Sequence, residues 1–232
     1  MAKQIGIIGV SAEGATLCYR TICSEGAPLL GRYAHPVLIM HNFPLNQYMV
    51  AIQAGRWDQV AELMLTSAQI LADAGAELLI CPDNTVHEAF DWIGDRAPLP
   101  WLHIADVVAE EAARQEYKQL GILGTRFLME GPVYSSKLAE RKIKHRTPPP
   151  DERQRINAII FDELVYGRLE ESSRAEFQQI ITRLGKKGCD AVVLGCTEIP
   201  LLIREGDSPL PILDSTRLLA RAALRRATGG KA

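Results

Sequence analysis

The sequence has no marked excess of charge, few aromatic residues and no long hydrophobic run. Its 26 lysines and arginines nearly balance 28 aspartates and glutamates, for a formal net charge of −2 over 232 residues. Proteins that bind nucleic acid through phosphate contacts are usually strongly basic, so we expect no nucleic-acid partner. No apolar stretch approaches the roughly 20 residues of a transmembrane helix, so we expect no membrane association.

The cysteines lack the spacings of a metal site or of a disulfide framework. There are five, an odd number, and no two stand in C-x-x-C order. The five histidines do not cluster near them, so we expect no metal centre. The first residues, MAKQIGIIGV, lead directly into a strand-like segment and do not resemble a secretory signal. Together these features predict a cytoplasmic protein with reduced thiols.

What the sequence does contain is an alternation of short apolar segments and helical patterns. Strands are expected at residues 4–10, 36–41, 77–81, just after 100, 119–123, 190–194 and 210–213. Helices are expected at residues 15–24, 57–74, 106–116, 129–141, 151–166, 172–186 and from 216 onward. Short buried strands that alternate with helices are typical of parallel β-α units, so the predicted fold class is α/β.

An internal repeat divides the chain. Three pairs of segments recur in the same order: IGIIG and LGILG, LLICPDNT and AVVLGCTE, and APLPWLHIAD and SPLPILDST. Their offsets are 115, 113 and 111 residues, counted from Gly9, Asp83 and Pro98. Three matches at a nearly constant offset predict two similar lobes, each a parallel sheet flanked by helices.

The repeat also predicts where the chemistry takes place. We assign residues 1–105 to the first lobe, which the C-terminal helix at 214–232 rejoins, and residues 106–213 to the second. Ligands of parallel α/β sheets bind beyond the carboxyl ends of the strands. Two lobes related by a pseudo-two-fold axis would hold the active site between them. Asp83 and Cys196 occupy equivalent positions past a strand, so we expect both to reach one ligand.

At these residues the sequence resembles the aspartate/glutamate racemases, a family that works without pyridoxal phosphate. The resemblance is carried by GIIGVS at 6–11, DNTVH at 83–87, the Gly-Thr pair at 124–125 and LGCTEIPLL at 194–202. It extends over almost the whole chain. It implies a cofactor-independent racemase or epimerase that acts at Cα of a small acidic amino acid, and a homodimer.

One position departs from the family pattern. The resemblance implies two cysteines that act as acid and base on the two faces of Cα. Cys196 supplies one of them, but Asp83 stands at the position of the other. A carboxylate of pKa ~3.9 is a far weaker base than a thiolate of pKa ~8.5, unless burial raises its pKa. Cys81 lies two residues earlier and is not expected to substitute.

The predicted site residues also have structural interpretations. Cys196 is either the catalytic thiol or a small buried side chain. Asp83 is either a proton-transfer group or a turn residue and helix N-cap. Asn84, Thr85 and Thr197 are assigned to binding of the substrate α-carboxylate, helped by amides at helix N-termini, and they also fit helix caps.

Four further residues, Ser11, Thr125, Glu198 and His87, also have two interpretations each or a purely structural one. Ser11 and Thr125 end the first strand of each lobe. The resemblance implies that their loops line the cleft, and the alternative is plain turn residues. Glu198 is either support for Cys196 or an acid favoured by a helix dipole. His87 is interpreted as a helix residue bonded to backbone and not as a catalyst.

Two other functions remain open. A single-cysteine lyase or decarboxylase on the same scaffold would use Cys196 to protonate a carbanion and would need no opposing base. A catalytically silent ligand-binding homologue would keep the cleft without turnover. A dinucleotide-binding protein is not favoured, because the glycine spacing of IGIIGVSAEG does not fit G-x-G-x-x-G.

Overall fold

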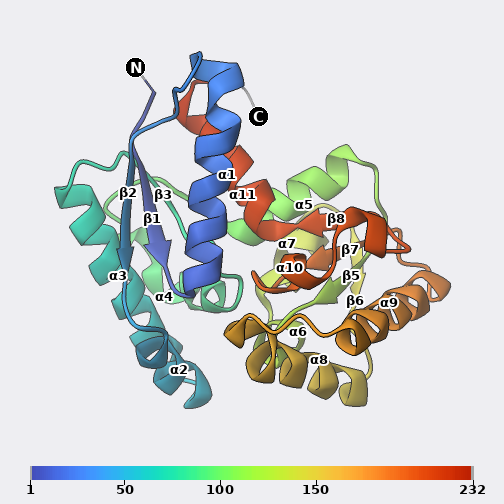
Figure 1. Ribbon diagram of the computed structural model, residues 1–232. Helices are drawn as coiled ribbons and strands as arrows, with labels where there is room; N and C mark the ends of the chain where they lie inside the picture. Colours follow the sequence, from blue (N-terminus) through green and yellow to red (C-terminus); the bar gives the residue numbers. More distant parts are fainter. Residues whose placement is uncertain (1, 231–232) are drawn as a thin grey trace. The chain divides into compact units, whose positions relative to one another are not determined.

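The computed structural model describes residues 2–230 (Figure 1). The chain divides into two compact units, Met1–Val107 with Thr216–Ala232, and Val108–Ser215. Each unit holds one four-stranded parallel sheet, as the α/β prediction requires. Residues 1 and 231–232, which belong to the first lobe expected from the sequence, lie outside the described residues.

The first sheet has the strand order β2-β1-β3-β4. Its central strands are β1 (Ile5–Gly9) and β3 (Leu78–Ile80), and its edges are β2 (Leu38–Asn42) and β4 (Trp101–Leu102). Every residue of β1 and β3 is buried, as expected of strands covered on both faces. The two edge strands are partly exposed.

The second sheet repeats this arrangement with the order β6-β5-β7-β8. Here β5 (Gln119–Leu123) and β7 (Ala191–Leu194) are central, and β6 (Lys144–Arg146) and β8 (Ile212–Asp214) form the edges. Each strand of one sheet has a counterpart at the same place in the other. The repeat in the sequence is therefore a repeat of topology, and the predicted fold class is confirmed.

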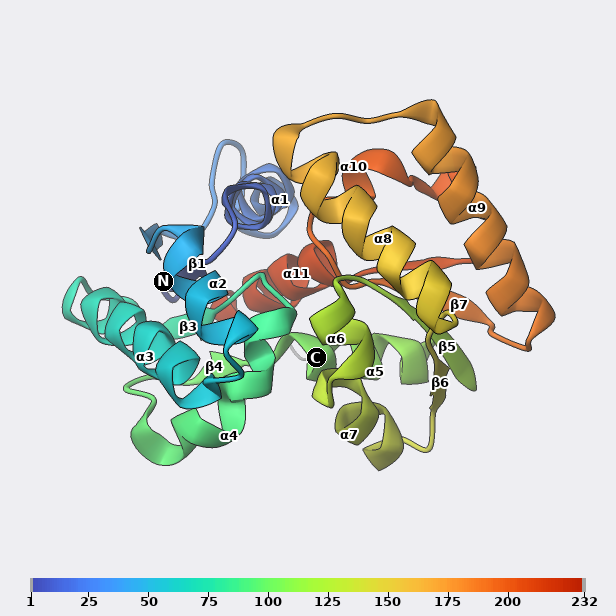
Figure 2. The same cartoon turned by 90° about the horizontal axis from the view of Figure 1, so that it is seen from below.

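Helices cover both faces of the first sheet. In the first unit they are α1 (Ala12–Leu30), α2 (Leu45–Gln53), α3 (Trp57–Asp73), η1 (Thr85–Ala89), α4 (Phe90–Ile93), η2 (Gly94–Arg96) and, from Thr216 onward, α11 (Ser215–Ala227). The helix α5 (Ile104–Arg114) begins in the first unit and continues into the second after Val107. Figures 1 and 2 show α1 and α3 on opposite sides of β1.

The side chains of β1 alternate between these two helical layers. Ile5 and Ile7 join one buried cluster with Ile22 of α1 and Leu219 of α11. Gly6 faces the other way, where a Cβ would lie 3.2 Å from the Cβ of Leu71 on α3. This alternation follows from the two-residue period of a strand.

The second unit has its largest buried cluster between the sheet and two long helices. Its helices are α6 (Arg126–Glu130), α7 (Val133–Glu140), α8 (Pro150–Asp162), η3 (Leu164–Tyr166), α9 (Glu171–Lys186), α10 (Ile199–Leu202) and η4 (Glu205–Asp207). Ile160 of α8 and Phe177 of α9 pack in this cluster with Val192 and Leu194 of β7. Figure 2 shows α8 and α9 side by side.

Some local predictions are corrected by the structure. The first helix continues to Leu30, past the predicted end at residue 24, and holds Pro28 within it. Neither α2 nor β6 was expected. The helix predicted from residue 151 is α8, which begins one residue earlier, with Pro149 at the N-cap position and Asp151 in the first turn. A carboxylate there still interacts favourably with the helix dipole.

Several features of the described residues bear on compartment and cofactors. No helix within residues 2–230 is long and apolar enough to cross a membrane. All five cysteines are free thiols. Nowhere in the same residues do three histidine, cysteine or carboxylate side chains gather in a way that would hold a metal ion.

Gly121 of β5 supports a prediction about stability. A Cβ at this position would lie 2.8 Å from Cδ1 of Leu184 and 3.0 Å from Cγ1 of Val192. Both of these side chains are buried, so they have little room to move. Gly121→Ala should lower the free energy of unfolding by about 1–3 kcal/mol, measured by urea denaturation. Gly206→Ala is the control, because a Cβ at Gly206 meets no described atom within 4 Å. Equal stability of the two variants would contradict the prediction.

Candidate active site

The strand order creates one distinctive location in each sheet. From β1 the chain crosses to β2 on one side, and it later returns to β3 on the other. The connections that leave the carboxyl ends of β1 and β3 therefore run in opposite directions. The connections after β5 and β7 do the same in the second sheet. Ligands of open α/β sheets bind at such points, so each unit has one candidate ligand-binding end.

The predicted site residues all follow the central strands. Ser11 follows β1, Asp83, Asn84 and Thr85 follow β3, Thr125 follows β5, and Cys196 and Thr197 follow β7. The sequence thus places chemistry-bearing side chains at the carboxyl ends of two neighbouring strands in each unit. Their roles stay predictions at this stage.

Ser11 and Thr125 are helix N-caps at equivalent places. The Ser11 Oγ accepts a hydrogen bond of 3.2 Å from the Gly14 N–H at the start of α1. The Thr125 Oγ1 accepts one of 3.3 Å from the Leu128 N–H of α6. Both residues thus have a structural role as helix N-caps, which differs from the plain turn residues that the sequence offered as the alternative. A hydroxyl that accepts such a bond still carries a proton to donate, so capping and ligand binding are compatible.

Asp83 also has a local structural role. Its Oδ1 accepts a hydrogen bond of 3.2 Å from the Val86 N–H in η1. Asn84 occupies the formal N-cap position, but among the described residues it makes no side-chain cap bond. The cap interpretation thus fits Asp83 and is wrong for Asn84. Asn84 and Thr85 are both buried, with 2% and 9% of their surfaces exposed.

The two helices after these loops are short. The helix η1 has five residues and α10 has four, so neither has room for two turns. The helix η1 runs directly into α4, so the helical segment after β3 is longer than η1 alone. The help of helix N-termini in holding a carboxylate stays a prediction. Carboxylate binding by the side chains of Asn84, Thr85 and Thr197 remains a prediction.

The best-defined polar arrangement surrounds Cys196. Its side chain is 8% exposed, and its Sγ donates a hydrogen bond of 2.9 Å to Oε2 of Glu198. The Thr197 hydroxyl donates to the same oxygen at 2.8 Å. Glu198 is itself 5% exposed. The formal N-cap residue of α10 is Glu198, and its side chain makes no cap bond.

This arrangement gives the Cys196 thiol a proton partner. A buried carboxylate needs hydrogen-bond donors, and here two donors converge on one oxygen of Glu198. The thiol proton thus points at a buried carboxylate oxygen. Of the two interpretations of Glu198, support for Cys196 is the one that this geometry favours.

Gly195 explains how the loop reaches this position. Its N–H donates a hydrogen bond of 2.7 Å to the Leu123 carbonyl, which extends the pairing of β5 and β7 by one residue. A Cβ on Gly195 would lie 3.0 Å from that carbonyl oxygen and would also strike the Leu128 side chain. Only glycine allows this close approach, so the residue before Cys196 is fixed by the sheet.

Cys81 is held in the thiol form. Burial raises its pKa well above the usual value for cysteine, and the nearby Asp83 raises it further. A thiol whose pKa is raised in this way is a poor base at neutral pH. This agrees with the expectation that Cys81 does not replace the missing cysteine.

Tyr48 of α2 is a residue that sequence reasoning missed. It is fully buried, and burial raises its pKa, with further increases from Cys81 and Asp83. Its phenol therefore belongs to the surroundings of the Asp83 loop. No motif contains it, and α2 was not expected, so the sequence carried no signal for this neighbour.

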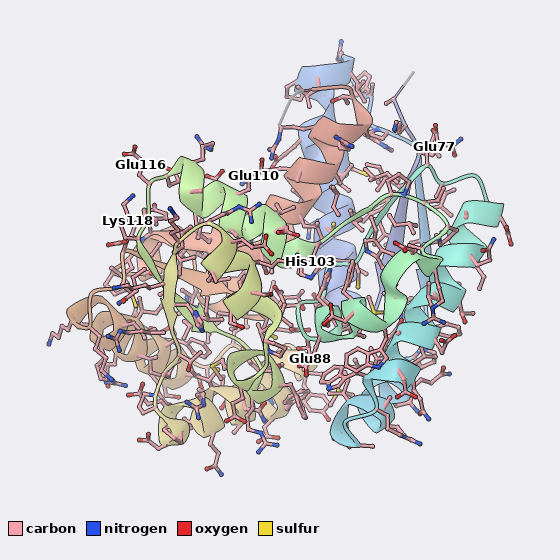
Figure 3. The ribbon with its side chains drawn as sticks, turned by 180° about the vertical axis from the view of Figure 1, so that it is seen from behind. Glu77, Glu88, His103, Glu110, Glu116 and Lys118 are labelled. Carbon is pink, nitrogen blue, oxygen red and sulfur yellow. The ribbon has the colours of Figure 1, made fainter. Side chains whose placement is uncertain are left out.

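Titratable groups with shifted pKa values lie near the carboxyl end of β3. Figure 3 labels Glu77, which precedes the strand, Glu88 in η1 beyond its other end, and His103, which precedes α5. Burial raises the pKa of Glu88. Titratable groups with perturbed pKa values thus gather at the carboxyl end of the strand, where Asp83 lies.

The family is identified by comparison. The sequence profile of the Asp/Glu/Hydantoin racemase family matches residues 5–223. The chain therefore belongs to this family, and the predicted resemblance is confirmed. Amino-acid racemases are isomerases, so the expectation of an isomerase family is confirmed as well.

Individual relatives agree with this assignment. A crystal structure from Yersinia pestis, provisionally described as an Asp/Glu racemase, is 33% identical, with a TM-score of 0.88 over 97% of this chain and 99% of that one. An aspartate racemase homologue from Pyrococcus horikoshii is 29% identical, with a TM-score of 0.84 over 97% and 99%. A broad specificity amino-acid racemase from Bacillus subtilis is 21% identical over 72% of each chain.

A more distant likeness concerns the fold alone. A mutant of arylmalonate decarboxylase is 16% identical, with a TM-score of 0.57 over 98% of this chain and 94% of that one. The same two-sheet arrangement therefore occurs in a protein named for a different reaction.

The contribution of the Asp83 cap to stability can be measured independently of any catalytic role. Asp83→Ala removes the acceptor of the Val86 N–H and should lower the free energy of unfolding by about 1 kcal/mol. Asp83→Asn keeps an oxygen in place, so its loss should be less than about half as large. Urea denaturation of both variants measures the difference. Equal losses would show that the cap does not stabilise η1.

His87 gives a prediction about pH. Burial lowers its pKa well below the usual value, and His103 lowers it further. In the unfolded chain His87 becomes protonated at pH ~6.5, whereas in the folded state it stays neutral at that pH. Its stabilising effect is therefore complete above that pH and is lost as the pH falls toward the folded-state pKa.

The test compares the wild type with His87→Asn. Relative to the variant, the wild type should lose up to about 1.4 kcal/mol of unfolding free energy per pH unit below ~6.5. Urea denaturation at intervals between pH 7 and pH 5 measures both slopes. Parallel slopes would contradict the prediction.

Proposed function

We propose that this protein is a cofactor-independent racemase of a small acidic amino acid. Cys196 and Asp83 exchange protons with the two faces of Cα in this proposal. Its main support is the buried hydrogen bond from the Cys196 thiol to Glu198, in a loop that follows a central strand. The family and the amino-acid racemases among the relatives support the reaction class.

The reaction starts with Asp83 ionised and Cys196 as a thiol. The Asp83 carboxylate removes the Cα proton of one enantiomer, and the electron pair of the broken C–H bond stays on carbon. The Cys196 thiol then delivers its proton to the opposite face. This turnover ends with Asp83 protonated and Cys196 as a thiolate. In the return direction the Cys196 thiolate removes the Cα proton of the other enantiomer, and Asp83 gives its proton back to the first face. Every proton thus has a donor and an acceptor.

Substrate binding is assigned to polar side chains. Asn84 and Thr85 follow one candidate catalytic residue and Thr197 follows the other. In this proposal they hold the α-carboxylate, which spreads the negative charge that develops at Cα. Ser11 and Thr125 supply further hydroxyl contacts. The proposed enzyme is cytoplasmic, as the unpaired cysteines indicate, and a homodimer, as the resemblance implies.

The two proton-transfer groups are unequal. A carboxylate is a much weaker base than a thiolate, and the Val86 N–H stabilises the ionised form of Asp83. Removal of a proton by Asp83 is therefore the slow step in this proposal. The same inequality favours a second candidate, a decarboxylase that uses the Cys196 thiol alone.

In that second reaction a disubstituted malonate loses CO2 and leaves a carbanion. The Cys196 thiol protonates it, and no opposing base is required. A protein named arylmalonate decarboxylase has a distantly similar fold. Asp83, already engaged as a cap, would then have no proton to transfer.

The test uses purified protein in deuterium oxide. With L- and D-aspartate and glutamate, the racemase proposal expects deuterium at Cα and interconversion of enantiomers. Cys196→Ser should lower the rate of interconversion by roughly 10²–10⁴-fold, because it removes the stronger of the two bases. Cys23→Ser, a change in a thiol on α1, serves as the matched control and should keep the rate.

Variants at Asp83 sharpen the test. Asp83→Asn keeps the cap oxygen but cannot take up a proton, so interconversion should stop. Asp83→Cys restores a thiol and should raise the rate. The absence of Cα exchange with either enantiomer would overturn the racemase proposal. CO2 release from 2-substituted malonates without interconversion would establish the decarboxylase, and ligand binding without any turnover would establish a silent homologue.

A further inference from the structure

His87 contacts the backbone of the candidate catalytic residue Asp83. It lies four positions later, in η1, and is 2% exposed. Its Nδ1 is 2.6 Å from the Asp83 carbonyl oxygen. On its other side, Nε2 is 3.3 Å from the Ile104 N–H, at the start of α5. One imidazole thus connects the segment after β3 to the helix after β4.

These two contacts determine the form of the ring. A carbonyl oxygen only accepts hydrogen bonds, so Nδ1 must carry a proton. A backbone N–H only donates, so Nε2 must be the unprotonated nitrogen. Both bonds exist together only in the neutral ring with its proton on Nδ1. The lowered pKa of His87 agrees with this form.

The surrounding rings hold the imidazole in this orientation. Phe90 stacks on it with centroids 4.8 Å apart and planes 6° from parallel. His103 meets its edge from 4.7 Å at an interplanar angle of 71°. Because rotation of the ring would break both the stacking and the two hydrogen bonds, the position of Nδ1 is well defined.

The Asp83 residue is therefore held at two atoms. Its carbonyl oxygen is fixed by His87, and its carboxylate Oδ1 by the Val86 N–H. Fixing the carbonyl fixes the peptide plane, which sets the direction in which the side chain leaves the backbone. Proton transfer depends steeply on this direction, because a displacement of about 1 Å can cost ~10²-fold in rate.

We propose that His87 is a positioning residue, which aims the Asp83 carboxylate through the bond from Nδ1–H to the Asp83 carbonyl. This inference rests on the proposed function, in which Asp83 serves one face of Cα. In this proposal His87 itself neither contacts the substrate nor transfers a proton. It should therefore affect the half-reaction at Asp83 and leave the half-reaction at Cys196 nearly unchanged.

Two isosteric variants separate the two bonds of the ring. In His87→Asn the amide nitrogen replaces Nδ1, so the bond to Asp83 is kept and that to Ile104 is lost. In His87→Gln the amide reaches the position of Nε2, so the bond to Ile104 is kept and that to Asp83 is lost. Wild type and both variants are assayed in deuterium oxide for two rates, enantiomer inversion and Cα exchange with retention through Cys196.

The expected result is a selective loss. His87→Gln should lower inversion by about tenfold or more, while exchange with retention stays within about threefold. His87→Asn should keep both rates within about threefold. A parallel fall of both rates in both variants would show a merely structural role and overturn the proposal. An unchanged inversion rate in His87→Gln would overturn it as well.

A measurement on the wild type covers the case in which the variants do not fold. Nitrogen-15 spectra of the imidazole should show the neutral ring with the proton on Nδ1 between pH 6 and pH 8. A proton on Nε2, or a charged ring, would overturn the proposal. Absence of inversion in the wild type would instead count against the proposed function, so the two failures are distinguishable.

Discussion

The constraint on which this structure depends is the placement of two neighbouring parallel strands whose chains leave in opposite directions. Their shared carboxyl end cannot be covered by their own connections, so polar loops remain there. In one sheet these loops carry Asp83 and in the other Cys196. Strand order thus determines where chemistry can take place, and the short loop sequences determine which chemistry it is.

Much of the fold could be predicted from the sequence, because buried parallel strands are short apolar runs and the repeat shows them twice. The exceptions have physical causes. The strand β6 is an exposed edge with the sequence KHR, so it has no apolar pattern. The site residues could be located from the motifs, but their contacts could not. Which of Asp83 and Asn84 makes the cap depends on side-chain geometry that spacing does not encode, and so does the choice between the two interpretations of Glu198. The backbone contact of His87 was expected, but not the atoms that it joins.

The two units use different groups at the same topological place. In the first, a neutral imidazole bonds to the backbone of the loop after β3. In the second, the Glu198 carboxylate bonds to the side chains of the loop after β7. A duplicated framework therefore holds two unlike loops at equivalent places, each with its own local hydrogen bonds.

This unlikeness has a consequence for the kinetics of a racemase. Mirror-image amino acids have equal free energies in water, so their equilibrium constant is one whatever groups the protein supplies. The ratio kcat/KM must then be equal for the two enantiomers. A weak base at Asp83 and a thiol beside Glu198 can still make the two kcat values differ, provided that the KM values differ in the same proportion. Asymmetry in the residues would thus appear as unequal saturation, not as an enrichment of either enantiomer.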